Sequence, residues 1–334
     1  MAQDVLKRTW RNKAKVLRMF LVTFSSFTVL ISFLNHNKTS NIKSSGSHKK
    51  TYAQIVATGG INNQIIATVN ALMLAKHTNI IVLTPIFSIQ SGSKYLPTTF
   101  ETYFEVKHFK VTLEKLGISV SLVPPQRCEQ KVLLPINSGR KFINTVSDIE
   151  GIVARNSKCK VIEIENQWAV RDWEGTYGTY MMLFEAFEPR PNLQAVYENY
   201  KKNILKQPYI ALHARVEKSW PTLYFNSNEE FGIEDEISGM LLHLEKTNLN
   251  GIRNVFILSG RDCEDEIFQP LKSAGYTLQC TDSRTTVFNH TGEVGRESYQ
   301  KALVDSLIAS DADHFVGRYA SSASYVLKLK RKAR

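Results

Sequence analysis

The chain has 334 residues, of which 43% are apolar and 10% aromatic, and its formal net charge is +11. Residues 1–50 hold ten Lys or Arg and one Asp, so residues 51–334 keep only 32 basic against 30 acidic residues. This composition is typical of a folded protein that can bury two hydrophobic cores. Because the folded part carries no basic stripe, the charge argues against nucleic acid as a partner.

A basic segment and then an uncharged apolar run open the chain. Residues 1–18 contain six Lys or Arg, and residues 19–34, MFLVTFSSFTVLISFL, contain no charge. Sixteen helical residues span about 24 Å, which suits a thin early-secretory membrane. We expect a cytoplasmic tail at 1–18, a transmembrane signal anchor at 19–34 and a lumenal remainder, which is type II topology. A cleaved signal peptide and a buried helix are the alternatives.

The segment 35–50 is polar and Ser-rich, as in a flexible stem. Asn37 and Asn289 each begin an Asn-x-Thr sequon, so both are candidate glycosylation sites in a lumenal protein.

Four cysteines are present, and none has the CxxC spacing of a zinc site. We expect one disulfide between Cys263 and Cys280 and another between Cys128 and Cys159. Buried free thiols are the alternative.

The body of the chain alternates strand and helix patterns. A strand at 52–58, a Gly-Gly break, a helix at 63–77 and a strand at 80–83 predict a βαβ unit. From about residue 208 the same alternation returns, ending in a helix from about residue 321. A Pro-bounded amphipathic helix within 187–208 separates the two parts. We therefore expect two Rossmann-like lobes, at 51–190 and 205–334.

The turn GGINNQ at 59–64 joins the first strand to the first helix. Gly60 lets the backbone approach a ligand closely, and the helix start favours an anion. The spacing fits neither a dinucleotide fingerprint nor a P-loop. A simple Gly turn with Asn as the helix cap is the alternative.

The strand YIALHAR at 209–215 presents His213 and Arg215 on one side at its carboxyl end. Ligands of open α/β sheets bind at this end, and the fork of an arginine suits a diphosphate. The alternative is a salt-bridged arginine beside a buried core histidine.

Ser321 and Ser322 stand at the predicted start of the last helix, where hydroxyls and free N–H groups can bind a phosphate or a ribose. A plain helix cap is the alternative. Asp311 and Asp313 form an Asp-x-Asp motif, but a helix-to-strand turn explains them, so we expect no metal site there.

Together these segments resemble the GDP-fucose O-fucosyltransferase superfamily, which includes plant relatives and bacterial α1,6-fucosyltransferases. The closing segment, LVDSLIASDADHFVGRYASSASYVLKLKR, carries most of the resemblance. HAR, followed by Trp220, is similar to the family's His-x-Arg, and GGINNQ to its first Gly turn. The resemblance spans about residues 52–331 and is faint from 86 to 205.

The resemblance implies a GT-B fold, with two Rossmann-like lobes facing across a cleft. It implies inverting, metal-independent transfer of fucose from GDP-fucose to a hydroxyl of a protein or glycan, with no cofactor. Arg215 would neutralise charge on the departing diphosphate, and Asn63 would lie near the reacting centre. The other residues that the resemblance assigns to the donor are Gly60, His213, Asp305, Ser321 and Ser322.

The sequence departs from the family's pattern at two places. Ala323 replaces an aromatic residue, and Ser259-Gly260 replaces Thr-Asp, so a guanine-contacting carboxylate is lost or is supplied by Asp262. A non-catalytic sugar- or nucleotide-binding relative, another donor such as UDP-rhamnose, and a membrane-tethered interaction protein stay open as alternatives. The short anchor and the lack of a retrieval signal favour the Golgi membrane over the endoplasmic reticulum.

Overall fold

The computed structural model describes residues 50–91, 94–125, 131–134, 142–154, 160–165, 177–216, 233–247, 251–281, 296–317 and 321–333. The described residues all belong to one compact unit, residues 49–334. No helix in this described part is long and apolar enough to cross a membrane. The expected tail and anchor, nearly all of the stem, both sequons and the first two cysteines lie outside it.

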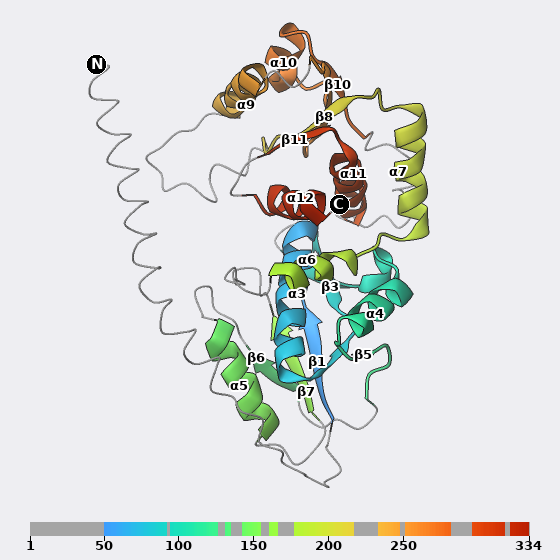
Figure 1. Cartoon of the computed structure of the whole chain (residues 1–334), viewed down its shortest axis with the longest axis vertical. Coiled ribbons are helices and arrows are strands. Elements are labelled where there is room, and N and C mark those ends of the chain that lie inside the picture. The colour runs from blue at the N-terminus through green and yellow to red at the C-terminus, as the bar shows by residue number, and fades with distance from the viewer. Residues whose placement is uncertain are drawn as a thin grey trace, which may run out of the picture. The chain divides into compact units, whose positions relative to one another are not determined.

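A mostly parallel sheet forms the first half of the described chain (Figure 1). Its central strand β1 pairs along its whole length with β7, and on its other side with β2 and then β3. β6 extends the sheet beyond β7, β5 extends it beyond β2, and β4 pairs antiparallel with β3. The described strands are β1 (Thr51–Val56), β2 (Ile81–Leu83), β3 (Ile86–Ser91), β4 (Lys94–Thr99), β5 (Val120–Ser121), β6 (Lys131–Leu134) and β7 (Lys160–Glu165).

Helix α3 (Ile61–Thr78) follows β1 and is buried over most of its length. Its apolar residues therefore point in nearly every direction, as expected of a helix enclosed by other elements. The other helical segments of this half are η1 (Phe100–Thr102), α4 (Val106–Lys115), α5 (Phe142–Ala154) and α6 (Tyr177–Glu185).

Aromatic packing fixes the region where the sequence resemblance is faint. Phe100 contacts the rings of Phe87, Phe104, Phe109 and Phe187 at centroid distances of 4.6–6.0 Å. These rings come from β3, η1, α4 and the residues that follow η1 and α6, so one cluster joins segments that are far apart in the sequence.

The second half contains a four-stranded parallel sheet in the order β10-β9-β8-β11. Strands and helices alternate along the chain, which is the doubly wound pattern expected from the sequence. The elements are β8 (Tyr209–His213), α9 (Ile233–Thr247), β9 (Asn254–Leu258), η3 (Glu266–Phe268), α10 (Gln269–Ser273), β10 (Thr277–Gln279), α11 (Arg296–Asp311), β11 (His314–Gly317) and α12 (Ser322–Ala333).

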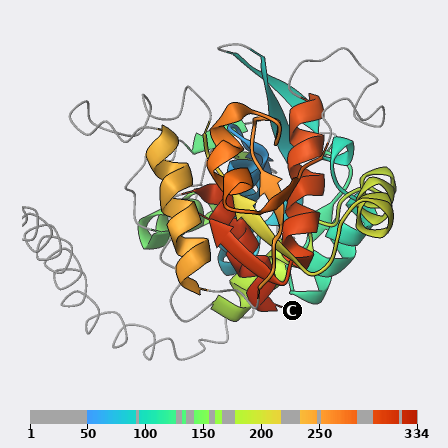
Figure 2. The ribbon, with the colours of Figure 1, turned by 90° about the horizontal axis from the view of Figure 1, so that it is seen from above.

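The two faces of this second sheet belong to different hydrophobic clusters. Ile210 and Leu212 of β8 pack with α9 and α10, whereas Tyr209 and Ala211 join the large cluster that includes α3, α11 and α12. Figure 2 shows α9 and α11 on opposite sides of the strands. Side chains of β8 with odd numbers therefore face α11 and α12.

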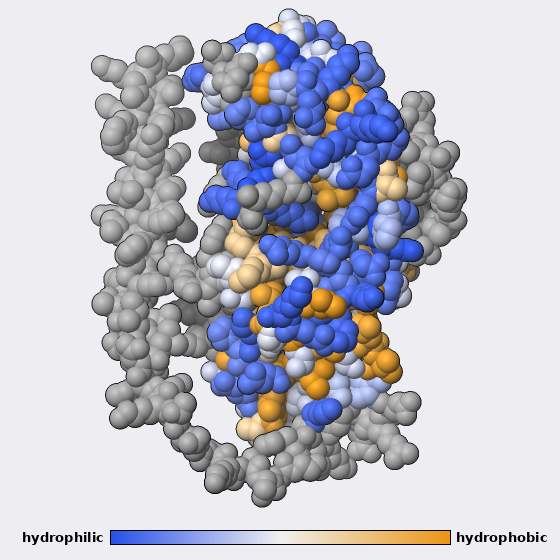
Figure 3. Space-filling view, turned by 45° about the vertical axis from the view of Figure 1, so that its right-hand side comes forward, coloured by the Kyte–Doolittle hydropathy of each residue, from blue (hydrophilic) through white to orange (hydrophobic). Residues whose placement is uncertain are grey.

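Helix α7 (Pro191–Asn203) lies between the two halves in the chain and packs against α11. Tyr197 and Lys201 of α7 both hydrogen-bond Asp311, the last residue of α11. The large cluster runs from the first sheet through α7 to α11 and α12. On the face shown in Figure 3, apolar residues lie in small groups among polar ones.

Candidate functional site

The second sheet has a topological switch point between β8 and β11. The chain leaves β8 toward β9 and β10 on one side and returns with β11 on the other. Ligands of doubly wound sheets bind at the carboxyl ends of the strands at such a point. His213 ends β8 and lies directly beside Gly317, which ends β11.

His213 is buried at this switch point. Its imidazole Nδ1 is 2.8 Å from Oγ of Ser324, in the first turn of α12. Burial, reinforced by the positive charge of Arg215, lowers the pKa of His213 to about 4. The ring is therefore neutral at physiological pH and can donate one N–H to a ligand.

Gly317 leaves room for this contact. A Cβ at this position would lie 2.5 Å from Oγ of Ser324 and 2.6 Å from Cζ of Phe315. Real Cβ atoms essentially never approach other atoms so closely. Glycine is therefore required here because His213 and Ser324 meet beside it.

Arg215 lies two residues beyond His213. Its neighbours Ala214 and Val216 are buried in the cluster under α9, so strand alternation directs Arg215 to the same side as His213. The backbone N–H of Arg215 donates to Oε1 of Glu236 on α9 at 3.3 Å. This contact holds the backbone that carries a guanidinium suited to bidentate phosphate binding.

The start of α12 completes this side of the site. Ser321 is 1% exposed, and its Oγ has no hydrogen-bond partner among the described residues. Ser322 is the first residue of the helix, and the first turn contains no acidic side chain. An unsatisfied hydroxyl beside the N–H groups of a helix start can bind a phosphate or a ribose oxygen.

The Gly turn follows β1 in the first sheet, at the switch point between β1 and β7. Gly59 has a φ of 92°, a conformation that favours glycine. Gly60 is the N-cap of α3 and no side chain caps it, so the expected alternative of an asparagine cap is wrong. Gln64 fixes the turn through hydrogen bonds to the carbonyls of Gly59 (2.6 Å) and Ser88 (2.7 Å).

Two asparagines follow this turn. A Cβ on Gly59 would lie 3.3 Å from Nδ2 of Asn63, so the Asn63 side chain lies close to the turn. Oδ1 of Asn62 is buried and has no hydrogen-bond partner among the residues described. Asn62 was not a candidate from sequence, although a buried acceptor at a helix start is a second possible ligand contact.

A direct hydrogen bond connects the Gly turn to α11. The hydroxyl of Tyr299 donates to the carbonyl oxygen of Gly59 at 2.9 Å. The ring of Tyr299 also lies 6.2 Å from that of Tyr103, centroid to centroid. Helix α11 also packs against α12, whose Ser324 contacts His213. The same helix therefore contacts both the Gly turn of the first sheet and α12.

Asp305 lies elsewhere on α11 and makes no described hydrogen bond to His213 or Arg215. Its carboxylate accepts from Oγ1 of Thr281 and from Nζ of Lys301, the latter at 2.8 Å. Burial raises the pKa of Asp305, while Lys301 and Thr281 oppose that shift. These contacts tie α11 to the segment after β10; a role toward a donor stays a prediction.

The two carboxylates of the Asp-x-Asp motif make structural contacts. Asp311 bonds Tyr197 and Lys201, and Oδ2 of Asp313 accepts from the backbone N–H of Tyr209 at 2.9 Å. Tyr209 begins β8 and His213 ends it, so these carboxylates lie at the amino ends of the strands, opposite His213. Their partners explain them without a metal.

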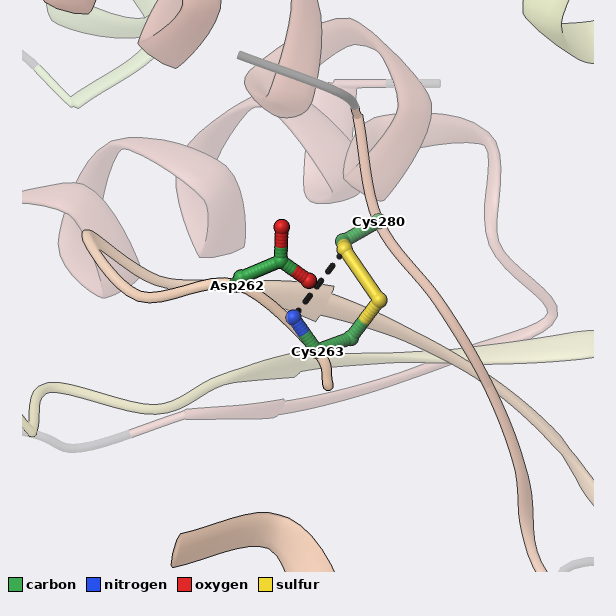
Figure 4. A group of neighbouring side chains, drawn as sticks. All are labelled: Asp262, Cys263 and Cys280. Carbon is green, nitrogen blue, oxygen red and sulfur yellow. Dashed lines mark hydrogen bonds between the residues drawn. A yellow bond between two sulfur atoms is a disulfide. The ribbon is translucent and has the colours of Figure 1, made fainter. Parts of the chain in front are cut away.

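Asp262, Cys263 and Cys280 form a compact group after β9 and β10 (Figure 4). Cys263 and Cys280 are joined by a disulfide, which is the pairing favoured from sequence. Neither sulfur is then a thiolate, so the group lacks the ligands that a metal needs. Asp262 is exposed and accepts from the backbone N–H of Glu264 at 2.9 Å in a local turn.

A cavity of about 490 Å³ lies away from the candidate residues. It is lined by residues at the amino ends of β1, β2 and β5, among them Lys50, Tyr52 and Ser119, and by Glu114 of α4. This is the opposite edge of the first sheet from the Gly turn.

Sequence reasoning missed three residues that organise the site: Ser324, Gly317 and Tyr299. Ser324 follows Ser321 by three residues and so lies on the same side of α12, a helical spacing visible in the sequence. Gly317 could have been noticed as the glycine that ends the strand pattern HFVG. Nothing local indicates that Tyr299 reaches the Gly turn 240 residues away.

Comparisons with known proteins bear on the family and the fold of the chain. The sequence model of the GDP-fucose protein O-fucosyltransferase family matches residues 52–334. A comparison with curated protein sequences gave no match.

Solved structures share the fold at low sequence identity. The crystal structure of POFUT1 in complex with GDP has a TM-score of 0.57 and 15% identity, over 86% of this chain and 96% of that one. The NodZ α1,6-fucosyltransferase soaked with GDP-fucose has a TM-score of 0.52 and 13% identity, over 84% and 92%. Fucosyltransferase NodZ from Bradyrhizobium has a TM-score of 0.51 and 14% identity, over 84% and 93%. These likenesses establish a mixed α/β, GT-B-like fold.

The family match covers most of the chain and both sheets, including the Gly turn, the strand that ends in His213 and the start of α12. The chain therefore belongs to the GDP-fucose protein O-fucosyltransferase family and is a glycosyltransferase.

Proposed function

We propose that this enzyme transfers fucose from GDP-fucose to a hydroxyl of a protein or glycan, with inversion at the anomeric carbon and without a metal. The observation that carries the proposal is the grouping of His213, Arg215 and Ser321 at one switch point of the second sheet. Relatives of the same fold were solved with GDP and with GDP-fucose. A nucleoside diphosphate is the ligand that these side chains suit best.

In the proposed step the acceptor oxygen attacks the anomeric carbon and the bond from that carbon to the β-phosphate oxygen breaks. GDP leaves with the electron pair of that bond, and the proton of the acceptor hydroxyl is released to water. The guanidinium of Arg215 would stabilise the charge growing on the diphosphate, an interaction that is stronger in the transition state than in the bound donor.

The other residues would hold the donor. The neutral His213 would donate from Nε2, and Ser321 and Ser322 would offer hydroxyl and N–H groups at the start of α12. Gly60 and Asn63 of the first turn would approach the sugar and the acceptor. Asp305 would act indirectly, by fixing α11.

Metal independence is proposed from the residues themselves. A diphosphate leaving group needs compensation of its negative charge, and Arg215 together with the helix start at Ser322 supplies it. The carboxylates of Asp311 and Asp313, the metal-type motif in the chain, are engaged in the fold.

A second reading is a non-catalytic relative, or an enzyme with another donor such as UDP-rhamnose. It is favoured by Ala323 and by Ser259-Gly260, which replace family residues on the base side of the site. Asp262 is exposed and accepts a hydrogen bond from the backbone of its own turn. Among the described contacts it therefore does not replace the missing guanine-contacting carboxylate.

A donor screen separates these readings. The purified full chain is incubated in EDTA with GDP-fucose, UDP-rhamnose and other sugar nucleotides, and nucleotide release is measured. GDP release from GDP-fucose alone is the expected result. Binding without release would favour the non-catalytic reading, and release only after Mn²⁺ is added would contradict metal independence.

The cellular setting is also a proposal. The basic tail, the apolar run at 19–34 and the sequons support a single-pass type II protein of the Golgi membrane with a lumenal catalytic part. Glycosidase sensitivity of the expressed chain and microscopy of the tagged protein would test it.

A further inference from the structure

We infer that Ser324 is a positioning residue that holds the imidazole of His213 in its Nε2-protonated form, ready to donate a hydrogen bond to the bound nucleotide. The identity of the ligand rests on the proposed function, whereas the tautomer is a property of the unliganded protein. Ser324 is the third serine of the sequence SSAS at residues 321–324.

The geometry fixes which ring nitrogen Ser324 contacts. Oγ of Ser324 lies 2.8 Å from Nδ1, and the two residues are 0% and 7% exposed. No other described side chain makes a hydrogen bond to the ring, so Nε2 is the nitrogen that can meet a ligand. The pair sits at the end of β8, at the switch point where the ligand is expected.

The chemistry of the ligand then indicates which tautomer the protein must present. Phosphate oxygens only accept hydrogen bonds, and a neutral imidazole has a single N–H. The ring is neutral because burial lowers the pKa of His213 to about 4. If Nδ1 carried the proton, the lone pair of Nε2 would face the phosphate oxygens. A hydroxyl that donates to Nδ1 prevents this, because the hydrogen bond at one ring nitrogen sets the proton at the other.

The surroundings hold the hydroxyl in place. Ser324 lies in the first turn of α12, and a Cβ at Gly317 would clash with both its Oγ (2.5 Å) and the ring of Phe315 (2.6 Å). Three elements, β8, β11 and α12, thus enclose one serine–histidine hydrogen bond. Such enclosure is what keeps a polar pair in a single geometry.

The test is the tautomer of His213 in the full chain, read by ¹⁵N NMR of labelled histidine, with His213→Gln used to assign the signals. The expected spectrum has a pyridine-type Nδ1 and a pyrrole-type Nε2 in the wild type, and a tautomer mixture in Ser324→Ala. A protonated Nδ1 in the wild type would overturn the inference, whether or not the variant folds.

Affinity for GDP, measured by calorimetry, tests the consequence for the ligand. Ser324→Ala should bind GDP roughly 2- to 12-fold more weakly, the range that one lost hydrogen bond produces. Ser310→Ala is the matched control, because Ser310 is also buried in a helix but its Oγ bonds the carbonyl of Ser306 on α11. Equal GDP affinities for Ser324→Ala and the control would overturn the role toward the nucleotide. A wild type that binds no GDP would contradict the proposed function instead, and the NMR spectra would still decide the tautomer.

Discussion

Replacing Gly317 by alanine tests the packing around His213 with the smallest possible change. The added methyl would lie 2.5 Å from Oγ of Ser324, 2.6 Å from Cζ of Phe315 and 2.9 Å from Cε1 of the same ring. Oγ of Ser324 has no free space to move into, because Ser324 is fully buried, and the partly buried Phe315 ring packs against the large hydrophobic cluster. The helix, the strand or the Phe315 ring must therefore move.

Overpacking of this kind costs about 1–3 kcal/mol of unfolding free energy. Movement of Ser324 would also break its hydrogen bond to His213, which adds about 0.5–1.5 kcal/mol. We expect Gly317→Ala to lower the urea midpoint with an unchanged m-value and to weaken GDP binding together with the Nε2–H signal of His213.

Gly239→Ala is the control for this experiment. Gly239 lies in α9, and a Cβ there would meet no atom within 4 Å. Alanine at an exposed helix position should stabilise the chain by roughly 0.5–1 kcal/mol. If Gly317→Ala were as stable as the wild type and bound GDP equally well, the packing argument would be refuted.

Three further predictions follow from the described contacts. Tyr299→Phe removes the hydroxyl that bonds the carbonyl of Gly59, and should lower GDP-fucose turnover and destabilise the fold by about 1 kcal/mol, measured by kinetics and urea unfolding. Because the pKa of His213 falls from 6.5 to about 4 on folding, only the unfolded state takes up its proton between these values. The free energy of unfolding should therefore drop on the order of 3 kcal/mol as the pH falls from 6.5 to 4, and His213→Gln should flatten that slope. The Cys263→Ala, Cys280→Ala double variant opens a disulfide between residues 17 apart, which should cost about 3 kcal/mol in urea unfolding.

Each of these has an outcome that would contradict it. Tyr209→Phe is the control for Tyr299→Phe, because its hydroxyl also bonds a backbone carbonyl, that of Ile308, but within the second half of the chain. Equal loss of turnover in both variants would mean that the link to Gly59 has no special role. An unchanged pH slope in His213→Gln, or an unchanged midpoint in the cysteine variant, would count against the other two.

Much of the second half of the fold could be predicted, because strand and helix patterns alternate there with clear breaks. The strand expected at 209–215 contains β8 (Tyr209–His213), and the helix expected from about residue 321 is α12 (Ser322–Ala333). In the first half, the strands from 86 onward and α4 were not predicted. The positions of β3 and α4 depend on the aromatic cluster around Phe100, which forms between distant segments and leaves no local period.

The site was predicted in part for the same reason. Period two along β8 directs His213 and Arg215 to one side, and the structure places His213 against α12 as that pattern requires. The partner of His213 could not be predicted, because the register of β8 against β11 brings Gly317 and Ser324 to it. Tertiary pairing, and not local sequence, decides such contacts.

The measurement that tests the central claim most directly is GDP release from GDP-fucose in EDTA by the full chain and by Arg215→Ala. Arg253→Ala is the control, because Arg253 is exposed, lies just before β9 and contacts Tyr276 and Ala274 away from the switch point. The account predicts release by the wild type and by Arg253→Ala, and loss of release in Arg215→Ala. Undiminished release by Arg215→Ala would contradict it.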